Sequence, residues 1–329
     1  LAQAQDPVFS QFYAAPLQFN PAFAGTTLAP RINLNYRNQW MAVDQQGYQT
    51  FAASYEQSIE RLNSGFGITI MADDAASGTY KTNFVNLVYG YKLRIQDDWH
   101  IKFGMEAGLI QTALDWDRLV FGDQIDPISG FNDPSGNPIL SQEQQPVNLN
   151  NTVFDVGAGI LVYNNNFYAG LSVKHLNTPD QNLLNVNENL NVGLPMRITV
   201  QSGVEITLER GNNREEGSFI SPNIMLIRQG DFGQINAGAY LSFGKFFGGM
   251  WYRHAWSNPD AGIGLVGFKQ GILRIGYSYD FTISSLQSSP AGGTGGTHEV
   301  SITINLDDSR SLKRKQYKSR YQDCFKMFR

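Results

Sequence analysis

The sequence lacks long apolar runs, has few charged residues and contains a single cysteine. No stretch of about 18 consecutive apolar residues occurs, which excludes a transmembrane helix. Charged residues make up 16% of the 329 residues, below the roughly 25% that is usual for soluble domains. One cysteine, Cys324, cannot form an internal disulfide. The net charge of −4 does not indicate a nucleic-acid-binding protein.

Glycine and aromatic residues are abundant instead, and apolar residues alternate with polar ones. The pattern is clearest in 271–283 and 296–306, where the polar positions include Arg274, Asp280 and Glu299. Strand side chains point to opposite faces with a period of two residues, so each of these segments has one apolar and one polar face. Strands of this kind are typical of outer-membrane barrels, which meet lipid on one side and a polar lumen on the other.

About 14 segments share this alternation, and an even number fits a single-chain bacterial barrel. Links after the even-numbered segments are short, whereas several of the others are long, such as 116–151 and 178–195. We therefore expect an all-β, transmembrane antiparallel barrel over 28–306 in a Gram-negative outer membrane, with long loops outside and both chain termini in the periplasm. The expected strands are 31–41, 47–58, 63–73, 79–95, 99–115, 152–163, 166–177, 196–210, 217–229, 232–243, 246–256, 260–269, 271–283 and 296–306.

Charged side chains fall on the strand face that is expected to line the lumen. Arg31, Arg37, Lys102 and Glu106 are examples. On the lipid face an Arg or Lys near the bilayer centre would cost about 2–4 kcal/mol, so an inward position is favoured. Two interpretations remain open: an ion-pair network that fills the lumen, or a path for ions or substrates.

Trp40 and three of the four histidines fall on the outward phase, near strand ends. For Trp40, His175, His254 and His298 this position predicts an aromatic girdle at the level of the lipid headgroups. The remaining histidine, His100, falls on the inward phase of a separate strand.

No motif for catalysis, a cofactor or a metal is present. The sequence has no phosphate-binding glycine loop, CxxC or HExxH. Asp73 and Asp74 form an acidic pair that we expect at an outer loop as a solvated turn, and a barrel hydrolase that uses them is a third alternative. Asp123, Asp126 and Asp133 lack a recognisable Ca²⁺-ligand spacing. We therefore expect a protein that is not an enzyme and has no cofactor.

Both ends of the chain depart from the strand pattern. Residues 1–4 resemble the end of a signal peptide that is cleaved before Gln5. Residues 5–27 hold three prolines and many aromatic residues, and we expect them to enter the lumen as a plug; a linker packed on the barrel rim is the alternative. Residues 307–329 form a basic tail, expected in the periplasm either solvated or against a partner or an anionic surface.

Two groups of residues carry a resemblance to a known family, and it runs essentially end to end. The first group is Asp6-Pro7-x-Phe9-Ser10-Gln11-Phe12-Tyr13, Asn20-Pro21-Ala22-Phe23-Ala24-Gly25 and Tyr36-Arg37-Asn38-Gln39-Trp40, and the second is Gly276-Tyr277-Ser278-Tyr279-Asp280 with Gly295-Gly296-Thr297-His298-Glu299. With these two groups the sequence resembles the PorP/SprF family of type IX secretion system outer-membrane proteins.

The resemblance implies a barrel that works with the type IX export machinery and the gliding apparatus. Members similar to SprF are paired with large surface adhesins that carry a type B C-terminal domain, and they support export or surface anchoring of that cargo. The implied partners are therefore an exported adhesin, periplasmic components of the machinery and outer-membrane lipids, with no nucleic acid.

The resemblance implies no catalytic residues, so the motif positions are expected to be structural or to bind partners. The Asn-Pro-Ala sequence at 20–22 also resembles FadL-type transporters, which makes an outer-membrane transporter of small or hydrophobic solutes the alternative function. The motif positions are Asp6, Pro7, Phe9, Gln11, Asn20, Pro21, Gly25, Arg37, Trp40, Asp280, His298 and Glu299.

Overall fold

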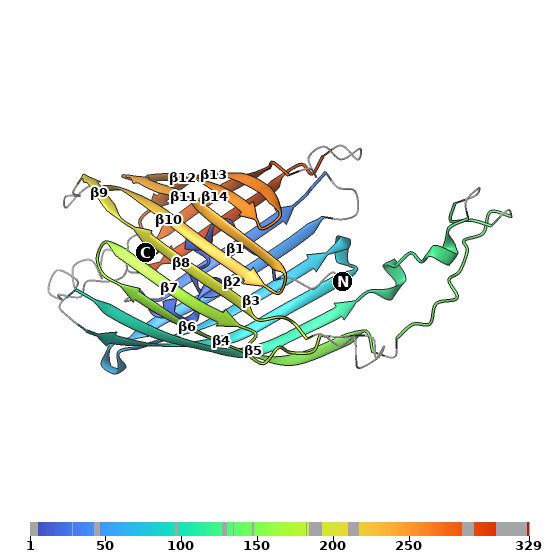
Figure 1. The fold of residues 1–329 in the computed structure, drawn as a ribbon, viewed down its shortest axis with the longest axis horizontal. Coiled ribbons are helices and arrows are strands. Elements are labelled where there is room, and N and C mark those ends of the chain that lie inside the picture. Colours follow the sequence, from blue (N-terminus) through green and yellow to red (C-terminus); the bar gives the residue numbers. More distant parts are fainter. Residues whose placement is uncertain are drawn as a thin grey trace.

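The strands form one closed antiparallel barrel of 14 strands, as predicted (Figure 1). The barrel closes because β1 pairs with β15 along its whole length. The labels run to β15 because Glu205 separates β8 from β9, and both pieces pair with the same neighbour, β10. The computed structural model describes residues 6–27, 29–42, 47–95, 98–126, 130–133, 135–146, 148–181, 183, 193–209, 217–284, 293–306 and 328.

Each strand joins its neighbour in chain order, so the barrel is a simple up-and-down meander. The strands are β1 (Arg31–Gln39), β2 (Tyr48–Ile59), β3 (Ser64–Ala75), β4 (Tyr80–Arg94), β5 (His100–Leu114), β6 (Asn150–Tyr163), β7 (Phe167–Lys174), β8 (Arg197–Val204), β9 (Ile206–Glu209), β10 (Ser218–Gln229), β11 (Phe232–Phe243), β12 (Phe246–Ala255), β13 (Asn258–Gln270), β14 (Leu273–Thr282) and β15 (Thr297–Asn305). The helical pieces are η1 (Phe12–Ala14), α1 (Pro16–Phe19), η2 (Pro21–Phe23), η3 (Glu60–Leu62), η4 (Ala76–Gly78), η5 (Trp116–Arg118) and η6 (Gly122–Gln124).

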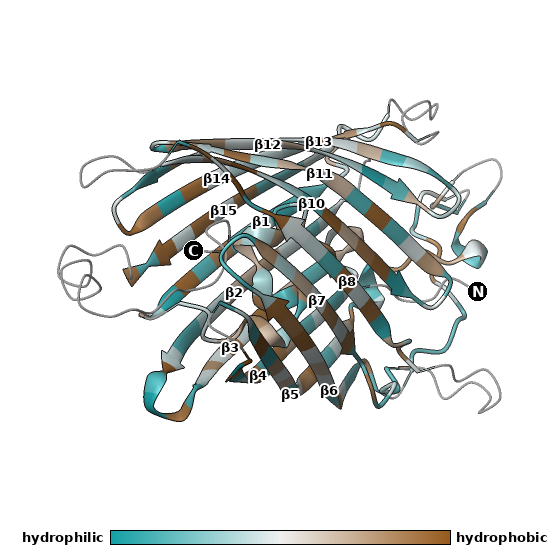
Figure 2. Cartoon of the chain, turned by 60° about the vertical axis from the view of Figure 1, so that its left-hand side comes forward, coloured by the Kyte–Doolittle hydropathy of each residue, from teal (hydrophilic) through white to brown (hydrophobic). Residues whose placement is uncertain are grey.

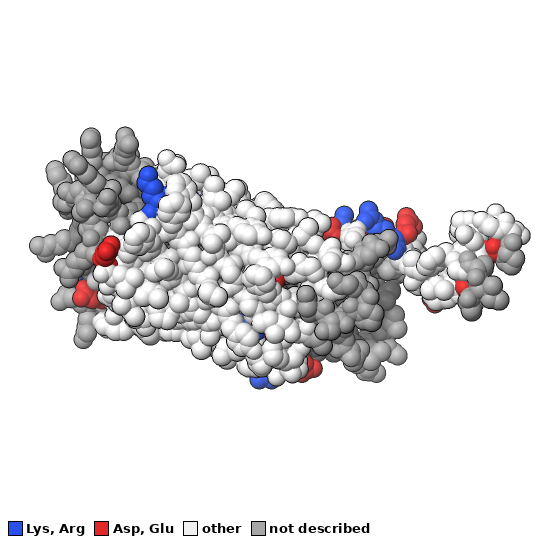
Figure 3. Space-filling view, turned by 90° about the horizontal axis from the view of Figure 1, so that it is seen from above, with Lys and Arg blue, Asp and Glu red and all other residues white. Residues whose placement is uncertain are grey.

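The alternation of the sequence becomes the two faces of the wall. On β1, Arg31 is 1% exposed while its neighbour Ile32 is 37% exposed. Apolar side chains such as Met105 and Met250 cover the outside, and brown apolar positions alternate with teal polar ones along the strands in Figure 2. Charged side chains on the face in Figure 3 gather toward the two ends of the barrel. Among the described helices, none is both long and apolar enough to cross a membrane.

The two ends of the barrel differ in the length of their links. We call the end that carries the links β1–β2, β5–β6, β7–β8 and β14–β15 the long-loop end, and the opposite end the short-turn end. The link between β5 and β6 extends well beyond the barrel as an arm (Figure 1). Asp123 orders this arm, because the Ser141 hydroxyl and the Gln142 N–H donate to its carboxylate. Arg31 at the start of β1 and Asn305 at the end of β15 both lie at the short-turn end.

Residues 6–27, the N-terminal segment, run through the inside of the barrel. Asp6 lies near the long-loop end, against His175 beyond the end of β7, whereas Thr26 contacts Arg31 at the short-turn end. It supplies ten of the 28 described residues of the buried apolar core, with Leu17 and Phe23 fully buried. Proline begins two of its short helices, at Pro16 and Pro21, where a missing N–H costs nothing.

A row of glycines lets the N-terminal segment lie directly against the wall. Gly65, Gly90, Gly104 and Gly159 pair with one another in register across β3, β4, β5 and β6. A Cβ atom on any of the first three would come closer than 3.0 Å to backbone atoms of Ala22 or Ala24, and on Gly159 it would meet the Asn20 side chain. Backbone cannot move aside as a flexible side chain can, so the positions of Gly65, Gly90 and Gly104 require glycine.

Two predicted orientations are wrong. Trp40 and His175 were expected on the lipid face, but Trp40 lines a cavity at the long-loop end and His175 is 2% exposed inside the barrel. Both follow directly after a strand and have positive φ, 61° for Trp40 and 58° for His175. A left-handed residue breaks the period-two alternation, and the side chain turns to the opposite face. His254 and His298 remain on the outer side, where each contacts a tyrosine hydroxyl.

The predicted segments at the chain ends lie largely outside the described residues. This is true of 1–4, of Cys324 and of the tail 307–329 except Phe328. The Phe328 ring is 2% exposed and packs inside the barrel, with its centroid 4.6 Å from that of Phe23 and 5.0 Å from that of Tyr168.

We predict that Gly104→Ala displaces the N-terminal segment while the barrel persists. The added methyl group collides with the backbone at Ala22, and overpacking of this kind costs about 1–3 kcal/mol. Limited proteolysis in detergent should then cleave within residues 6–27, and thermal melting should shift down. Gly264→Ala is the matched control, because a Cβ there meets only a ring carbon of Phe281 at 3.8 Å. If Gly104→Ala and Gly264→Ala were equally resistant to the protease, the close contact between Gly104 and the backbone at Ala22 would be contradicted.

Candidate functional site in the barrel lumen

Inward side chains of the barrel pair the backbone groups of the N-terminal segment. Because this segment is not part of the sheet, its buried N–H and C=O groups need partners elsewhere. The contacts, in chain order, are Gln229 to Asp6 N–H (3.0 Å), Glu299 to the N–H groups of Ser10 and Gln11 (2.8 and 2.9 Å), Arg197 to Gln18 C=O (2.6 Å), Ser172 to Phe19 C=O (2.5 Å), Lys102 to Ala24 C=O (2.6 Å) and Glu56 to Gly25 N–H (2.8 Å).

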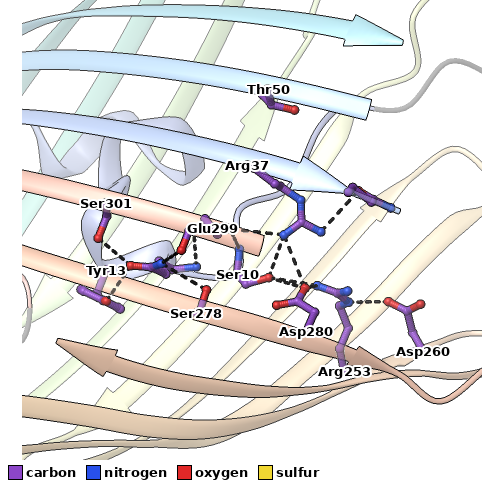
Figure 4. A network of polar contacts seen from close by, with 12 residues as sticks. Ser10, Tyr13, Arg37, Thr50, Arg253, Asp260, Ser278, Asp280, Glu299 and Ser301 are labelled. Carbon is purple, nitrogen blue, oxygen red and sulfur yellow. Dashed lines mark hydrogen bonds and ion pairs between the residues drawn. The ribbon is translucent and has the colours of Figure 1, made fainter. Parts of the chain in front are cut away.

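Glu299 on β15 forms the centre of the contact with residues 10–11 (Figure 4). Each oxygen of its carboxylate accepts one backbone N–H, and the Gln11 amide in turn donates to the Glu299 backbone carbonyl at 2.9 Å. The same amide donates to Ser278, and Ser301 donates to its oxygen. This reciprocal pairing fixes the direction of the chain as it passes β14 and β15.

Two arginines from different strands continue this network. Arg37 on β1 contacts Glu299 at 3.2 Å, Asp280 at 3.4 Å and the Ser10 hydroxyl at 2.8 Å. Arg253 on β12 contacts Asp280 at 2.9 Å and also pairs with Asp260. All but Ser10 and Asp260 are less than a tenth exposed, so each charge depends on the others for compensation.

A second cluster holds the start of the N-terminal segment. Asp6 accepts from Arg197 and meets His175 Nε2, both at 2.8 Å, while His175 Nδ1 lies 3.0 Å from Asp155. Burial alone would lower the pKa of His175, but Asp6 and Asp155 outweigh it and raise the pKa to about 9. Burial would likewise raise the pKa of Asp6, but His175 and Arg197 hold it well below its ordinary value of 3.8. The cluster is therefore an ion pair at neutral pH.

At the short-turn end, a third cluster holds the turn into β1. Arg31 pairs with Glu56, whose other oxygen accepts the Gly25 N–H. Gly25 has φ of +68°, and a Cβ there would meet the backbone of Gly65. Asn20 caps η2 through the Ala22 N–H, and its amide donates to the backbone carbonyl of Ile160.

Above Asp6 and Pro7, a cavity of about 570 Å³ lies at the long-loop end of the barrel. Its floor includes Val8 of the N-terminal segment, and Arg37 and Arg253 border it. Its walls combine aromatic residues with polar residues of β2, β3, β4, β11 and β13, among them Trp40, Tyr48, Thr50, Asp73, Tyr80, Phe232, Gln234 and Asp260.

The structure brings together some of the motif positions and separates others. Asp6, Gln11, Arg37, Asp280 and Glu299 belong to the networks that hold the first part of the N-terminal segment. Phe9 is buried in the core and Pro7 lines the cavity, while Asn20, Pro21 and Gly25 lie toward the short-turn end. Trp40 lines the cavity wall, and His298 lies on the outer surface beside Tyr277.

Several members of these networks were not identified from the sequence. The alternation along its strand predicted an inward position for Arg253. Nothing in the sequence predicted that Asp260 would be its partner. His175, Asp155 and Arg197 carry no local motif that joins them to Asp6. In the arm, the backbone N–H groups of Asn137 and Ser135 donate to Asp133 and lower its pKa. Among the described residues, no group of three or more possible metal ligands occurs.

The sequence matches, over residues 1–304, the family described as type IX secretion system membrane protein PorP/SprF. The chain belongs to the PorP/SprF family. Family and fold together indicate a non-enzymatic outer-membrane β-barrel of a secretion system. No curated protein matches the sequence.

Solved structures similar to this PorP/SprF barrel include the toluene transporter TodX of Pseudomonas putida. It has 10% identity and a TM-score of 0.46, over 92% of this chain and 93% of that chain. Salmonella typhi OmpF, solved with daunomycin, has 10% identity and a TM-score of 0.37 over 84% and 96%. Identities and TM-scores this low say nothing about the function of this protein.

We predict that Glu299→Ala releases residues 6–13 of this PorP/SprF protein without opening the sheet. The change leaves two backbone N–H groups unpaired and removes a partner of buried Arg37, a loss of about 3–5 kcal/mol. Hydrogen exchange measured by mass spectrometry should show lost protection in that stretch. Glu209→Ala removes an exposed carboxylate at the barrel end and is the control. Unchanged protection in Glu299→Ala would contradict this assignment.

The Asp6–His175 pair predicts a pH window for attachment of the N-terminal segment. A raised pKa means that the stabilisation by His175 is fully present below pH 6.5 and is lost as the pH rises through about 9. A lowered pKa means that the contribution of Asp6 is present above pH 3.8 and is lost as the pH falls below that value. Protease resistance of residues 6–13 should therefore decline above pH 9, and His175→Asn should abolish this alkaline step. His298→Asn, on the outer surface, should keep it; a step common to all three proteins would contradict the assignment.

Proposed function

We propose that this protein supports export of a large adhesin with a type B C-terminal domain and anchors it at the cell surface. Membership of the PorP/SprF family supports a role with the type IX machinery and its cargo in general. The arm between β5 and β6 is the observation that carries the finer proposal, since it reaches beyond the barrel at the end with the longest links. In this proposal the long-loop end faces the outside of the cell.

The arm presents large apolar side chains to solvent. Val120, Ile125, Phe131 and Leu140 are between 51% and 83% exposed. The surrounding contacts that order the arm are polar, such as the Gln124 amide to the Ile139 carbonyl at 3.2 Å. Ordered, exposed apolar groups beyond a membrane barrel are a mark of a protein-binding surface. The arm would hold the adhesin outside the membrane.

The filled lumen also supports anchoring over transport. Residues 6–27 pass from one end of the barrel to the other and contribute ten of the 28 described residues of its apolar core. We propose that this N-terminal segment closes the lumen as a plug. With the long-loop end outside, Asp6 would face the exterior, so the periplasmic machinery would meet the short-turn end and not the start of the N-terminal segment.

We predict that the paired change Phe131→Ser and Leu140→Ser lowers recovery of the adhesin with this barrel by about tenfold or more. Loss of two apolar anchors removes the hot-spot contribution to a protein interface. The measurement is mild-detergent purification of the barrel from its native outer membrane, followed by mass spectrometry for the adhesin's C-terminal domain. The matched control is Gln144→Ser with Gln145→Ser, two exposed polar residues of the same arm.

Barrel abundance and heat-modifiable gel mobility should be equal in all three proteins. A wild-type barrel that is recovered alone, together with solute uptake by the same strain, would contradict the anchor and favour the transporter of small or hydrophobic solutes.

A further inference from the structure

Asp73 on β3 is an uncompensated carboxylate in the wall of the long-loop cavity. Seven other carboxylates inside the barrel each meet a cationic side chain: Asp6, Glu56, Glu106, Asp155, Asp260, Asp280 and Glu299. Within the described part of the chain, no ion pair joins Asp73. The Thr50 hydroxyl donates a hydrogen bond to its carboxylate, at 2.6 Å. Burying a carboxylate without a nearby cation costs free energy. Binding sites are one place where proteins retain such a group.

The strand register shows why no neighbouring side chain neutralises Asp73. Its partners across the sheet are Thr50 on β2 and Thr82 on β4, both neutral. Arg37, which also lines the cavity, is already paired with Asp280 and Glu299. A cation that pairs with Asp73 would therefore come from outside the described part of this chain.

The remaining lining of the cavity suits a peptide. Trp40 and Tyr48 form an edge-to-face pair, with ring centroids 5.7 Å apart, near the same wall as Asp73. Aromatic faces beside a carboxylate favour a lysine or arginine side chain through cation–π contacts. Gln234 is 5% exposed, and its amide nitrogen has no hydrogen-bond partner in the described structure; the same holds for the Gln181 nitrogen. Two unused donors suit the carbonyl groups of a peptide backbone.

We propose that this cavity binds a short peptide segment of the cargo through a lysine or arginine side chain, with Asp73 as the partner of the cationic group. The volume, about 570 Å³, lies within the range of about 300–1,000 Å³ that is usual for ligand pockets. Trp40 and Tyr48 cover the aliphatic part of the basic side chain, and Gln181 and Gln234 donate to the peptide carbonyls. The source of the peptide rests on the proposed function, whereas the chemistry of the cavity can be tested without the adhesin.

The test uses the purified full-length barrel in detergent and three acetylated, amidated pentapeptides. Their sequences are Gly-Gly-Lys-Gly-Gly, the same with norleucine, and the same with glutamate, so that the third side chain is cationic, neutral or anionic. Saturation-transfer NMR measures the affinity. The lysine peptide should bind at least tenfold more tightly than the other two, and Asp73→Asn should lower its affinity about tenfold.

Asp74→Asn is the matched control, because alternation along the strand points Asp74 to the face opposite Asp73 and it does not line the cavity. It should leave the affinity unchanged within twofold. The peptide comparison uses the unmodified protein and holds even if Asp73→Asn fails to fold. Equal binding of the three peptides, no effect of Asp73→Asn, or binding of neutral maltotriose in place of the peptides would overturn the proposal. If the adhesin is recovered with the barrel but the lysine peptide shows no preference, only this inference fails; a lysine-specific site without the adhesin would overturn only the anchoring function.

Discussion

The structure depends on pairing the backbone of a segment that runs through a barrel without joining its sheet. Residues 6–27 contribute short helices and turns, and these leave N–H and C=O groups that no strand can satisfy. Inward side chains supply the missing partners, from Gln229 at one end to Glu56 at the other. Because two of these side chains, Glu56 and Glu299, are buried carboxylates, they in turn need the cations Arg31 and Arg37 of a neighbouring strand. The polar lumen and the N-terminal segment therefore stabilise each other.

This dependence explains why a polar barrel interior is compatible with a filled lumen. Glu299 binds two backbone N–H groups while it pairs with Arg37, and Glu56 binds the Gly25 N–H while it pairs with Arg31. The row of glycines on β3 to β6 supplies the space, since it brings the backbone of the N-terminal segment into contact with the wall. The polar contacts and the close packing both act on the N-terminal segment. Close packing without the polar partners would leave its buried N–H and C=O groups unsatisfied.

Much of the fold could be predicted from the sequence, because strand alternation is a local property. The inward positions of Arg31, Lys102 and Glu106 follow from it directly, and all three are buried. The sequence prediction for His175 and Trp40 gave the wrong face. The alternation holds only within a strand, and both residues lie directly after a strand end with a positive φ. The glycine row appears only once the register is known, since Gly65 and Gly104 are brought together by pairing and not by sequence spacing. The motif around Asp6 and the motif around Glu299 were identified as sequence signals, but their meeting inside the barrel is a property of its closure.

In the proposed function the N-terminal segment closes the lumen of the barrel, and single-channel conductance in a planar bilayer tests this most directly. The intact chain should insert without a steady conductance across a wide voltage range, while a variant that lacks residues 6–24 and retains heat-modifiable folding should show open channels. A large, steady conductance of the intact protein that is unchanged by the deletion would contradict it.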